Sequence, residues 1–280
     1  MSFSPESYPT ELQSISAFSS ETEAPYKAYF FGPFRLVFEN QSLGESVWRR
    51  NKAKALLKWF LLNPGKLFSM EQLIKQFWPN TPPDSAMRNF HVTIHYLRHL
   101  LEPDLKPHQE SKFVRRNKNN FYWFVLGGSW WSDVFDVQHH YGAAKDADRN
   151  GDAATAISHY RHVVSSCSRG FLPEDVYDDV FYLYRQQYDY IAIQALERLI
   201  TLCSQMNMFD EVMTYSLQIL SLDPYCEAAI KAIINVYLRQ GNSAGAIRKL
   251  DDFQHFLRQE LGITPSENIL SLREKILKER

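Results

Sequence analysis

The chain has 280 residues, of which 45% are hydrophobic and 22% are charged, and its formal net charge is -1 at pH 7. These proportions are ordinary for a globular protein, and the length suffices for about two domains. The net charge excludes an indiscriminate polycation, but it hides an uneven distribution. Residues 1–25 carry a net -4, residues 26–126 carry 16 Lys or Arg against 7 Asp or Glu, a net +9, and residues 127–280 carry a net -6. A polyanionic partner for the basic block therefore stays open.

Cysteine use and hydropathy exclude other classes of protein. The three cysteines, Cys167, Cys203 and Cys226, lie far apart and form no CxxC pair. Neither a cysteine zinc motif nor a disulfide framework is therefore expected. No apolar run approaches the ~18 residues that span a bilayer, and the N-terminus lacks the pattern of a secretory signal. We expect an intracellular, cytoplasmic protein with no membrane contact.

The first elements read as a leader, strands and a helix. Residues 1–25 are rich in Ser, Glu, Pro and Thr, which is typical of a disordered leader. Residues 28–48 alternate aromatic and small side chains around the Gly32-Pro33 turn, with a second turn at Asn40-Gln41, and predict strands. Residues 51–62 carry apolar side chains at helical spacing and predict a helix that ends at Asn63-Pro64-Gly65.

Two more helices and a hairpin follow. Ser69 and Gln72 form a capping box for the second helix. The third helix spans about residues 85–101, with Asp84 or Ser85 as its cap, and ends before Pro103. Residues 113–124 form two β-prone arms around a tip rich in Asn and Lys, which predicts a hairpin. Strands, three helices and a hairpin, in this order, indicate a winged helix-turn-helix over residues 26–126.

The remainder, residues 127–280, is nearly all helical from Asp133 onward. Short turns separate helices of about 14 to 25 residues, which suits stacked antiparallel pairs. The segment Gly151–Ile157 resembles Gly241–Ile247, and Met208 lies 33 residues before Gly241, close to the tetratricopeptide (TPR) period of about 34 residues. The predicted fold class is thus mainly α with small β: an N-terminal winged helix-turn-helix followed by an all-α, TPR-like repeat domain.

The third helix carries the candidate residues for reading DNA. One stripe is apolar and predicted to be buried: Phe90, Ile94, Leu97 and Leu101. The other faces mix cationic, amide, imidazole and apolar groups: Arg88, Asn89, His91, Val92, His95, Tyr96, Arg98 and His99. In a major groove, Arg pairs with guanine, Asn with adenine, and Val contacts a thymine methyl group. The alternative is an ordinary amphipathic surface helix.

Two further cationic groups strengthen the DNA interpretation. Arg115, Arg116 and Lys118 lie at the hairpin tip, where cations suit phosphate or minor-groove contact. A second group opens the first helix, whose N-terminal N–H groups also attract phosphate; it comprises Arg49, Arg50, Lys52, Lys54 and Lys58. Each group alone is compatible with a solvated surface. Three basic elements in one block favour a nucleic-acid interface.

Metal and catalytic sites are not predicted. His91 and His95 are spaced to share a metal, but no nearby Cys, Asp or Glu completes a site, and His139-His140 is no more convincing. The chain contains no phosphate loop, no GxGxxG and no GxSxG motif. The acidic runs are predicted to be solvated: Glu174-Asp175, Asp178-Asp179 and Asp251-Asp252. We therefore expect no enzyme activity, no cofactor and no metal.

Several short motifs occur in a specific order. In the front half they are Phe31–Phe34, Lys54–Leu57, Met70–Trp78 and Arg88–Leu100; in the back half they are Trp131–Phe135, Gly170–Pro173, Asp223–Glu227 and Glu260–Pro265. Over about residues 27–280 the chain thereby resembles the SARP-type transcriptional activators. These join an OmpR-like winged helix to a bacterial transcriptional activator domain.

The resemblance implies a sequence-specific transcriptional regulator, an activator, with double-stranded DNA at promoter direct repeats as its partner. It places Arg88–Arg98 on the recognition helix and Arg115–Lys118 on the wing. It also implies side-by-side homodimers on DNA and contact with RNA polymerase. Two departures bear on specificity: the wing tip lacks glycine, and His95-Tyr96 replaces an Arg-rich pair. The competing hypothesis is a TPR-like protein-interaction scaffold whose winged helix does not read DNA specifically.

Overall fold

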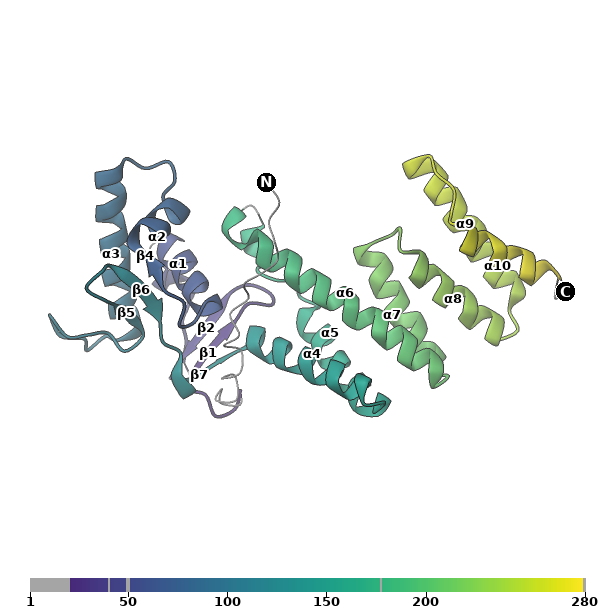
Figure 1. The fold of residues 1–280 in the computed structure, drawn as a ribbon, viewed down its shortest axis with the longest axis horizontal. Helices are drawn as coiled ribbons and strands as arrows, with labels where there is room; N and C mark the ends of the chain where they lie inside the picture. The colour runs from purple at the N-terminus through teal and green to yellow at the C-terminus, as the bar shows by residue number, and fades with distance from the viewer. Residues whose placement is uncertain (1–20, 40, 49–50, 177, 279–280) are drawn as a thin grey trace. The chain divides into compact units, whose positions relative to one another are not determined.

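The computed structural model describes residues 21–39, 41–48, 51–176 and 178–278 (Figure 1). The chain divides into two compact units: the first is Met1–Asp136 with Leu172–Leu183, and the second is Val137–Phe171 with Tyr184–Arg280. The predicted fold class is confirmed, because a winged helix-turn-helix precedes a helical array. The domain ranges 26–126 and 127–280 stay a prediction. Most of the predicted leader lies outside the described residues, but Ala24 is buried and Glu21 accepts a hydrogen bond from the Tyr29 hydroxyl.

A four-stranded sheet opens the first unit. Strands β1 (Tyr26–Tyr29), β2 (Arg35–Phe38) and β3 (Gln41–Ser42) are antiparallel, as the alternating side chains predict. Strand β7 (Trp130–Ser132) pairs parallel with β1 and completes the order β3-β2-β1-β7. The sequence did not predict β7, because three residues are too few to show a period. Its Trp130 is only 1% exposed and packs edge-on against Phe113 and Phe124.

Three helices follow the first three strands: α1 (Asn51–Leu62), α2 (Met70–Phe77) and α3 (Pro83–Leu101). The predicted capping box is confirmed, because Ser69 Oγ accepts from the Gln72 N–H and Gln72 Oε1 accepts from the Ser69 N–H. The predicted caps of the third helix are wrong. Pro82 is the N-cap and Pro83 opens the helix, which costs no hydrogen bond because the first N–H groups of a helix have no partner within it.

The predicted hairpin is confirmed as β5 (Val114–Arg116) and β6 (Phe121–Phe124). A short strand, β4 (Phe68–Ser69), pairs with β6 and makes a second sheet of order β4-β6-β5. The buried face of β6 carries Tyr122 and Phe124. The Tyr122 ring meets Phe90 of α3 at 5.0 Å between centroids, and Phe124 stacks on Phe60 of α1 at 6.4 Å. The wing is therefore fixed to the helices by aromatic packing.

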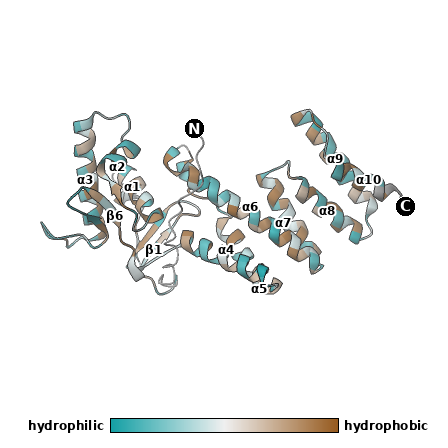
Figure 2. Ribbon diagram, in the orientation of Figure 1, coloured by the Kyte–Doolittle hydropathy of each residue, from teal (hydrophilic) through white to brown (hydrophobic). Residues whose placement is uncertain are grey.

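Helices make up nearly all of the second unit. Their bounds are α4 (Asp133–Arg149), α5 (Ala153–Cys167), α6 (Tyr182–Gln205), α7 (Phe209–Leu222), α8 (Glu227–Arg239), α9 (Ser243–Leu261) and α10 (Glu267–Lys278); α4 and α6 begin within the first unit. Three short 3-10 helices, η3 (Gly127–Ser129), η4 (Pro173–Asp175) and η5 (Asp179–Phe181), belong to the first unit, as does η2 (Glu45–Val47). In Figure 2, apolar and polar residues alternate along these helices. No helix in the described part of the chain is long and apolar enough to cross a membrane.

The internal echo noted in the sequence has a structural basis. Gly151 and Gly241 both adopt positive φ, 77° and 72°, just before a new helix. The next residue caps that helix in both cases: Asp152 accepts from the Thr155 N–H, and Asn242 accepts from the Gly245 N–H. The two turns are therefore built alike, with a left-handed residue where glycine has no steric cost.

Candidate nucleic-acid interface

Helix α3 buries one stripe and exposes another. Phe90, Ile94, Leu97 and Leu101 are all at most 4% exposed, which confirms the predicted apolar stripe. Five of the candidate residues are exposed on the remaining surface: Arg88, Asn89, His91, Val92 and His95. Val92 is 45% exposed although it is apolar. A mixed polar and apolar face of this kind suits direct contact with base edges.

Tyr96 and Arg98 differ from these five residues, because the protein itself uses their polar groups. The Tyr96 hydroxyl donates to the Val47 carbonyl oxygen. The Arg98 Nε donates to the Val114 carbonyl oxygen at 3.1 Å, and burial lowers the pKa of the Arg98 guanidinium. The Tyr96 side chain thus joins α3 to η2, and the Arg98 side chain joins α3 to β5.

The tight turn of the wing tip forms without glycine, because two asparagines supply the hydrogen bonds and the left-handed backbone conformation that it needs. Asn117 Oδ1 accepts from the backbone N–H groups of Asn119 and Phe121, both at 3.0 Å. Asn120 adopts a φ of 59°, the left-handed region that asparagine tolerates better than most residues. The tight turn expected from the sequence therefore exists. Lys118 is exposed at its tip.

The two wing arginines make contacts within the hairpin or beside it. Arg116 Nε donates to Asn120 Oδ1 at 3.0 Å, and its guanidinium lies 5.8 Å from the centre of the Tyr122 ring. Arg115 Nη1 lies 3.5 Å from a carboxylate oxygen of Glu110, a pair in which the arginine side chain is 42% exposed and the glutamate side chain 83% exposed. Exposed pairs of this kind contribute little to stability, roughly 0–1 kcal/mol, and phosphate can compete for the guanidinium.

The cations of the first helix do not form one group. Arg49 and Arg50 lie outside the described residues. Lys52 is exposed at the start of α1, as predicted for a phosphate contact. Lys58 is only 1% exposed, so its proposed place in the DNA-facing cluster is wrong.

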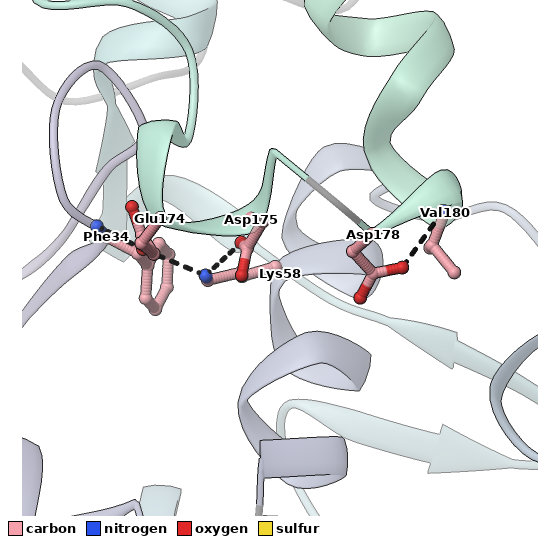
Figure 3. A network of polar contacts seen from close by, with 6 residues as sticks. All are labelled: Phe34, Lys58, Glu174, Asp175, Asp178 and Val180. Carbon is pink, nitrogen blue, oxygen red and sulfur yellow. Dashed lines mark hydrogen bonds and ion pairs between the residues drawn. The ribbon is translucent and has the colours of Figure 1, made fainter.

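Lys58 is held by two carboxylates (Figure 3). Its Nζ lies 3.1 Å from Glu174 Oε1 and also contacts Asp175 Oδ2. Glu174 Oε1 accepts a further hydrogen bond from the Phe34 N–H at 2.7 Å. We call this network the Lys58 clamp. Glu174 and Asp175, predicted to be solvated, are partly exposed, but both also pair with this ammonium, because a buried ammonium requires charged partners.

The surroundings of Glu174 in the Lys58 clamp favour the ionised form of its carboxyl group. Burial alone would raise the pKa of Glu174, but the Phe34 N–H and the Lys58 ammonium outweigh burial and lower it below its ordinary value. The sequence held one signal for the Lys58 clamp. Lys58 is the single charged residue within the apolar run Ala55–Leu62, where an exposed lysine is out of place.

Hydrogen bonds to backbone groups hold the segment Leu172–Leu183 and the start of α4 in place within the first unit. The Leu172 N–H donates to the Phe30 carbonyl oxygen at 2.9 Å. The N–H groups of Phe30 and Phe31 donate to the buried carboxylate of Asp133 at 2.9 and 3.0 Å. Asp178, predicted to be solvated, caps η5 by accepting from the Val180 N–H at 3.1 Å. These acidic residues are thus structural.

The histidines of α3 form no complete metal site among the described residues. The rings of His95 and His99 meet at 4.4 Å between centroids. In the described ranges, no group of three or more potential metal ligands includes a histidine of α3.

Comparison with known proteins gives matches over both parts of the chain. The family model described as bacterial transcriptional activator domain matches residues 132–277. The model described as transcriptional regulatory protein, C terminal, matches residues 44–117, which include α3 and the first arm of the wing.

One curated relative is the regulatory protein AfsR of Streptomyces griseus, 21% identical over 225 residues, which are 80% of this chain and 22% of the relative. The chain thus spans about a fifth of that relative's length. Among solved structures, Mycobacterium tuberculosis EmbR in complex with a low affinity phosphopeptide matches with a TM-score of 0.72 at 17% identity. That match covers 92% of this chain and 66% of the EmbR chain, and it shows a shared fold.

Proposed function

The chain belongs to the bacterial transcriptional activator domain family, and we propose that it regulates transcription by binding DNA sequence-specifically through α3 and the wing. The observation that carries this proposal is the exposed face of α3, where Arg88, Asn89 and Val92 stand opposite a fully buried apolar stripe. Val92, 45% exposed, adds an apolar contact beside these cationic and amide groups. Direct base readout uses this mixture of groups.

The proposal divides the candidate residues by role. We assign base contacts to Arg88, Asn89, His91, Val92 and His95, and we name this set with Lys118 the α3–wing surface. We assign phosphate contacts to the remaining cations: Lys118, Arg115, Arg116, Lys52, Arg49 and Arg50. Tyr96 and Arg98 position α3, because their polar groups bind the backbone at Val47 and Val114.

The remaining parts of the proposal concern partners. The helical unit contacts RNA polymerase and makes the protein an activator, and two copies bind side by side on direct repeats. The family to which the chain belongs supports this part, and so does the relatedness to a regulatory protein. A TPR-like scaffold without specific DNA binding is the outcome that would contradict it.

The test is selection of bound duplexes from a randomised double-stranded pool by the purified full chain. We expect one enriched motif, present as a repeat, and binding to it at least about 10³-fold tighter than to a scrambled duplex. Val92→Ser should change which base is preferred without changing the salt dependence, while Arg248→Ala on α9, an exposed arginine of the second unit, serves as the matched control. Enrichment of no motif, with weak and sequence-blind binding, would establish the scaffold instead.

A further inference from the structure

The exposed side of α3 repeats the spacing of its buried side. The buried apolar stripe, which begins at Phe90, follows the pattern i, i+4, i+7, i+11. The same pattern, begun two residues earlier, selects four exposed side chains, which we call the exposed stripe: Arg88, Val92, His95 and His99. Two residues correspond to about 200° around a helix, so the exposed stripe lies opposite the buried one. His99, to which the proposed function gives no role, therefore lies on the same face of α3 as Arg88.

His95 and His99 contact each other within the exposed stripe. Their rings meet edge to face, with 4.4 Å between centroids and 69° between planes. Two imidazolium ions this close repel each other, so the His95–His99 pair takes up one proton more readily than two. Histidine changes its charge between about pH 5 and 8, so the pair is neutral or singly charged near neutral pH. His99 is the better place for the proton, because it lies in the last turn of α3, where the helix dipole favours a cation.

The elements that pack against α3 bring mostly positive charge to its surroundings. These elements are α1, α2 and β5. Their charged residues are six cations and one carboxylate: Lys52, Lys54, Lys58, Lys75, Arg115, Arg116 and Glu71. Glu71 lies exposed in the first turn of α2. A proton on the His95–His99 pair thus adds to a basic surface.

The acidic residues on and just after α3 do not pair with the two imidazoles. Asp84 lies in the first turn of α3, at the opposite end from His99. Glu102 follows α3 and accepts hydrogen bonds from the Ser111 hydroxyl and, at 2.8 Å, from the Lys112 N–H. No carboxylate in the described part of the chain forms an ion pair with His95 or His99. A polyanion is therefore the partner that favours the protonated pair.

The length of α3 indicates which part of a DNA duplex His99 can reach. A rise of about 1.5 Å per residue places His99 about 16 Å along the helix axis from Arg88. Recognition helices insert their N-terminal residues among the base edges, and the major groove is only about 12 Å wide. A helix that places Arg88 on a base therefore carries His99 toward the phosphates at the edge of the groove. An imidazolium ion has two N–H donors and no acceptor, which suits a phosphate oxygen.

We propose that His99 contacts a DNA phosphate in its protonated form, so that DNA binding takes up one proton at the His95–His99 pair. This inference rests on the proposed function, and it adds to that function a further DNA-contacting residue and a dependence of affinity on pH. If the bound state holds one proton more than the free state, the affinity falls as the pH rises, by at most about 10-fold per pH unit. Mild acid thus strengthens binding and mild alkali weakens it.

The test measures binding of the full chain to the selected duplex by fluorescence anisotropy, at fixed ionic strength, from about pH 6 to about pH 8.5. We expect the affinity to fall across this range, with the steepest part approaching about 10-fold per pH unit. Calorimetry in two buffers of different ionisation enthalpy should find uptake of about one proton per protomer. The slope of log affinity against log salt should be steeper by about one unit at the acidic end, where one more phosphate contact is charged.

Variants assign the proton to His99. His99→Gln, at an exposed position, should remove the proton uptake and the extra salt slope while the far-ultraviolet circular dichroism stays unchanged. His99→Lys stays charged throughout the range, so it should keep high affinity at the alkaline end and show no proton uptake, which a merely structural role does not predict. His95→Gln should keep the uptake, because the His99 ring remains. His255→Gln on α9, an exposed histidine of the second unit, is the matched control and should keep the pH profile of the wild type.

The outcomes separate this inference from the proposed function. Specific binding with an unchanged pH profile in His99→Gln, or with proton uptake lost only in His91→Gln or His95→Gln, overturns the inference and leaves the proposed function intact. Equal affinity for selected and scrambled duplexes at every pH overturns the proposed function, and the inference with it.

Discussion

The α3–wing surface and the helical unit carry cations of the same kind but use them differently. In the helical unit, arginines connect helices: Arg161 of α5 pairs with Glu211 of α7, and Arg273 of α10 lies 3.2 Å from Asp251 of α9. On the α3–wing surface, Arg88 bonds only to the Ser85 hydroxyl, at 3.0 Å, and Lys118 meets no carboxylate among the described residues. Arg88 and Lys118 therefore keep their charges available for a polyanion, whereas Arg161 and Arg273 use theirs in contacts between helices.

The Lys58 clamp is a buried paired cation within the unit that also carries the α3–wing surface. Lys58→Ala removes an ammonium that is 1% exposed and that contacts Glu174 and Asp175, whose side chains are 30% and 22% exposed. Loss of a buried partner costs about 3–5 kcal/mol. Since water reaches both carboxylates, we expect a destabilisation of about 2–3 kcal/mol in urea unfolding.

Lys52→Ala, on the exposed side of α1, is the matched control and should change the free energy of unfolding by less than about 0.5 kcal/mol. Acid gives an independent measurement. Because the pKa of Glu174 is lowered in the folded state, its stabilising contribution is complete above the ordinary pKa of 4.5 and is lost as the pH falls through the lowered pKa. Lys58→Ala should lose less stability than the wild type over that pH range. Identical acid sensitivity in both proteins would show that the Lys58 clamp does not stabilise the unit.

Arg88→Ala tests whether an arginine of the α3–wing surface reads a base of the DNA. An arginine that reads a guanine bidentately is worth about 1–3 kcal/mol of discrimination. We expect a loss of that size for the selected duplex, measured by fluorescence anisotropy, with little loss for a scrambled duplex and unchanged unfolding.

Arg98→Ala is the informative contrast on the same helix. Its guanidinium binds the Val114 carbonyl oxygen, so the variant should lose stability and weaken binding to all sequences alike. If Arg98→Ala relaxes specificity while Arg88→Ala does not, the division of α3 into base-contacting and positioning residues is wrong.

The sequence predicted features formed by residues close together in the chain, and it missed contacts between residues far apart in the chain. Apolar spacing predicted α3 and its stripe, and Ser69 with Gln72 predicted a cap, because both signals are complete within a few residues. The Lys58 clamp joins residues 116 and 117 positions apart, and β7 pairs with β1 across about a hundred residues. Such contacts leave no periodic pattern of residue types in the sequence.

Lys118→Ala tests a phosphate contact, for which the expected change is smaller and differs in kind. One phosphate contact fewer should reduce the slope of log affinity against log salt by about one unit, and affinity by about 1 kcal/mol at moderate salt. The loss should be equal for selected and scrambled duplexes, measured across a salt series. Lys231→Ala on α8, an exposed lysine of the helical unit, should leave the slope unchanged. A slope change in the control and none in Lys118→Ala would move the phosphate contact away from the wing.

The smallest expected effect tests the structural cations. Arg198 of α6 pairs with Asp148 of α4 through two hydrogen bonds, Nε to Oδ2 at 2.8 Å and Nη2 to Oδ1 at 2.7 Å. The Arg198 side chain is 44% exposed, so solvent screens the pair, and its coupling should lie near 0.5–1 kcal/mol, about the upper end for surface pairs. A double-mutant cycle of Arg198→Ala and Asp148→Asn, followed by urea unfolding, measures that coupling.

Arg149 with Asp146, 70% and 71% exposed, is the control pair and should couple by less. DNA affinity should not change in any of these variants, because a cation occupied within the helical unit has no role at the α3–wing surface; a loss of affinity in Arg198→Ala would remove the distinction between the two regions.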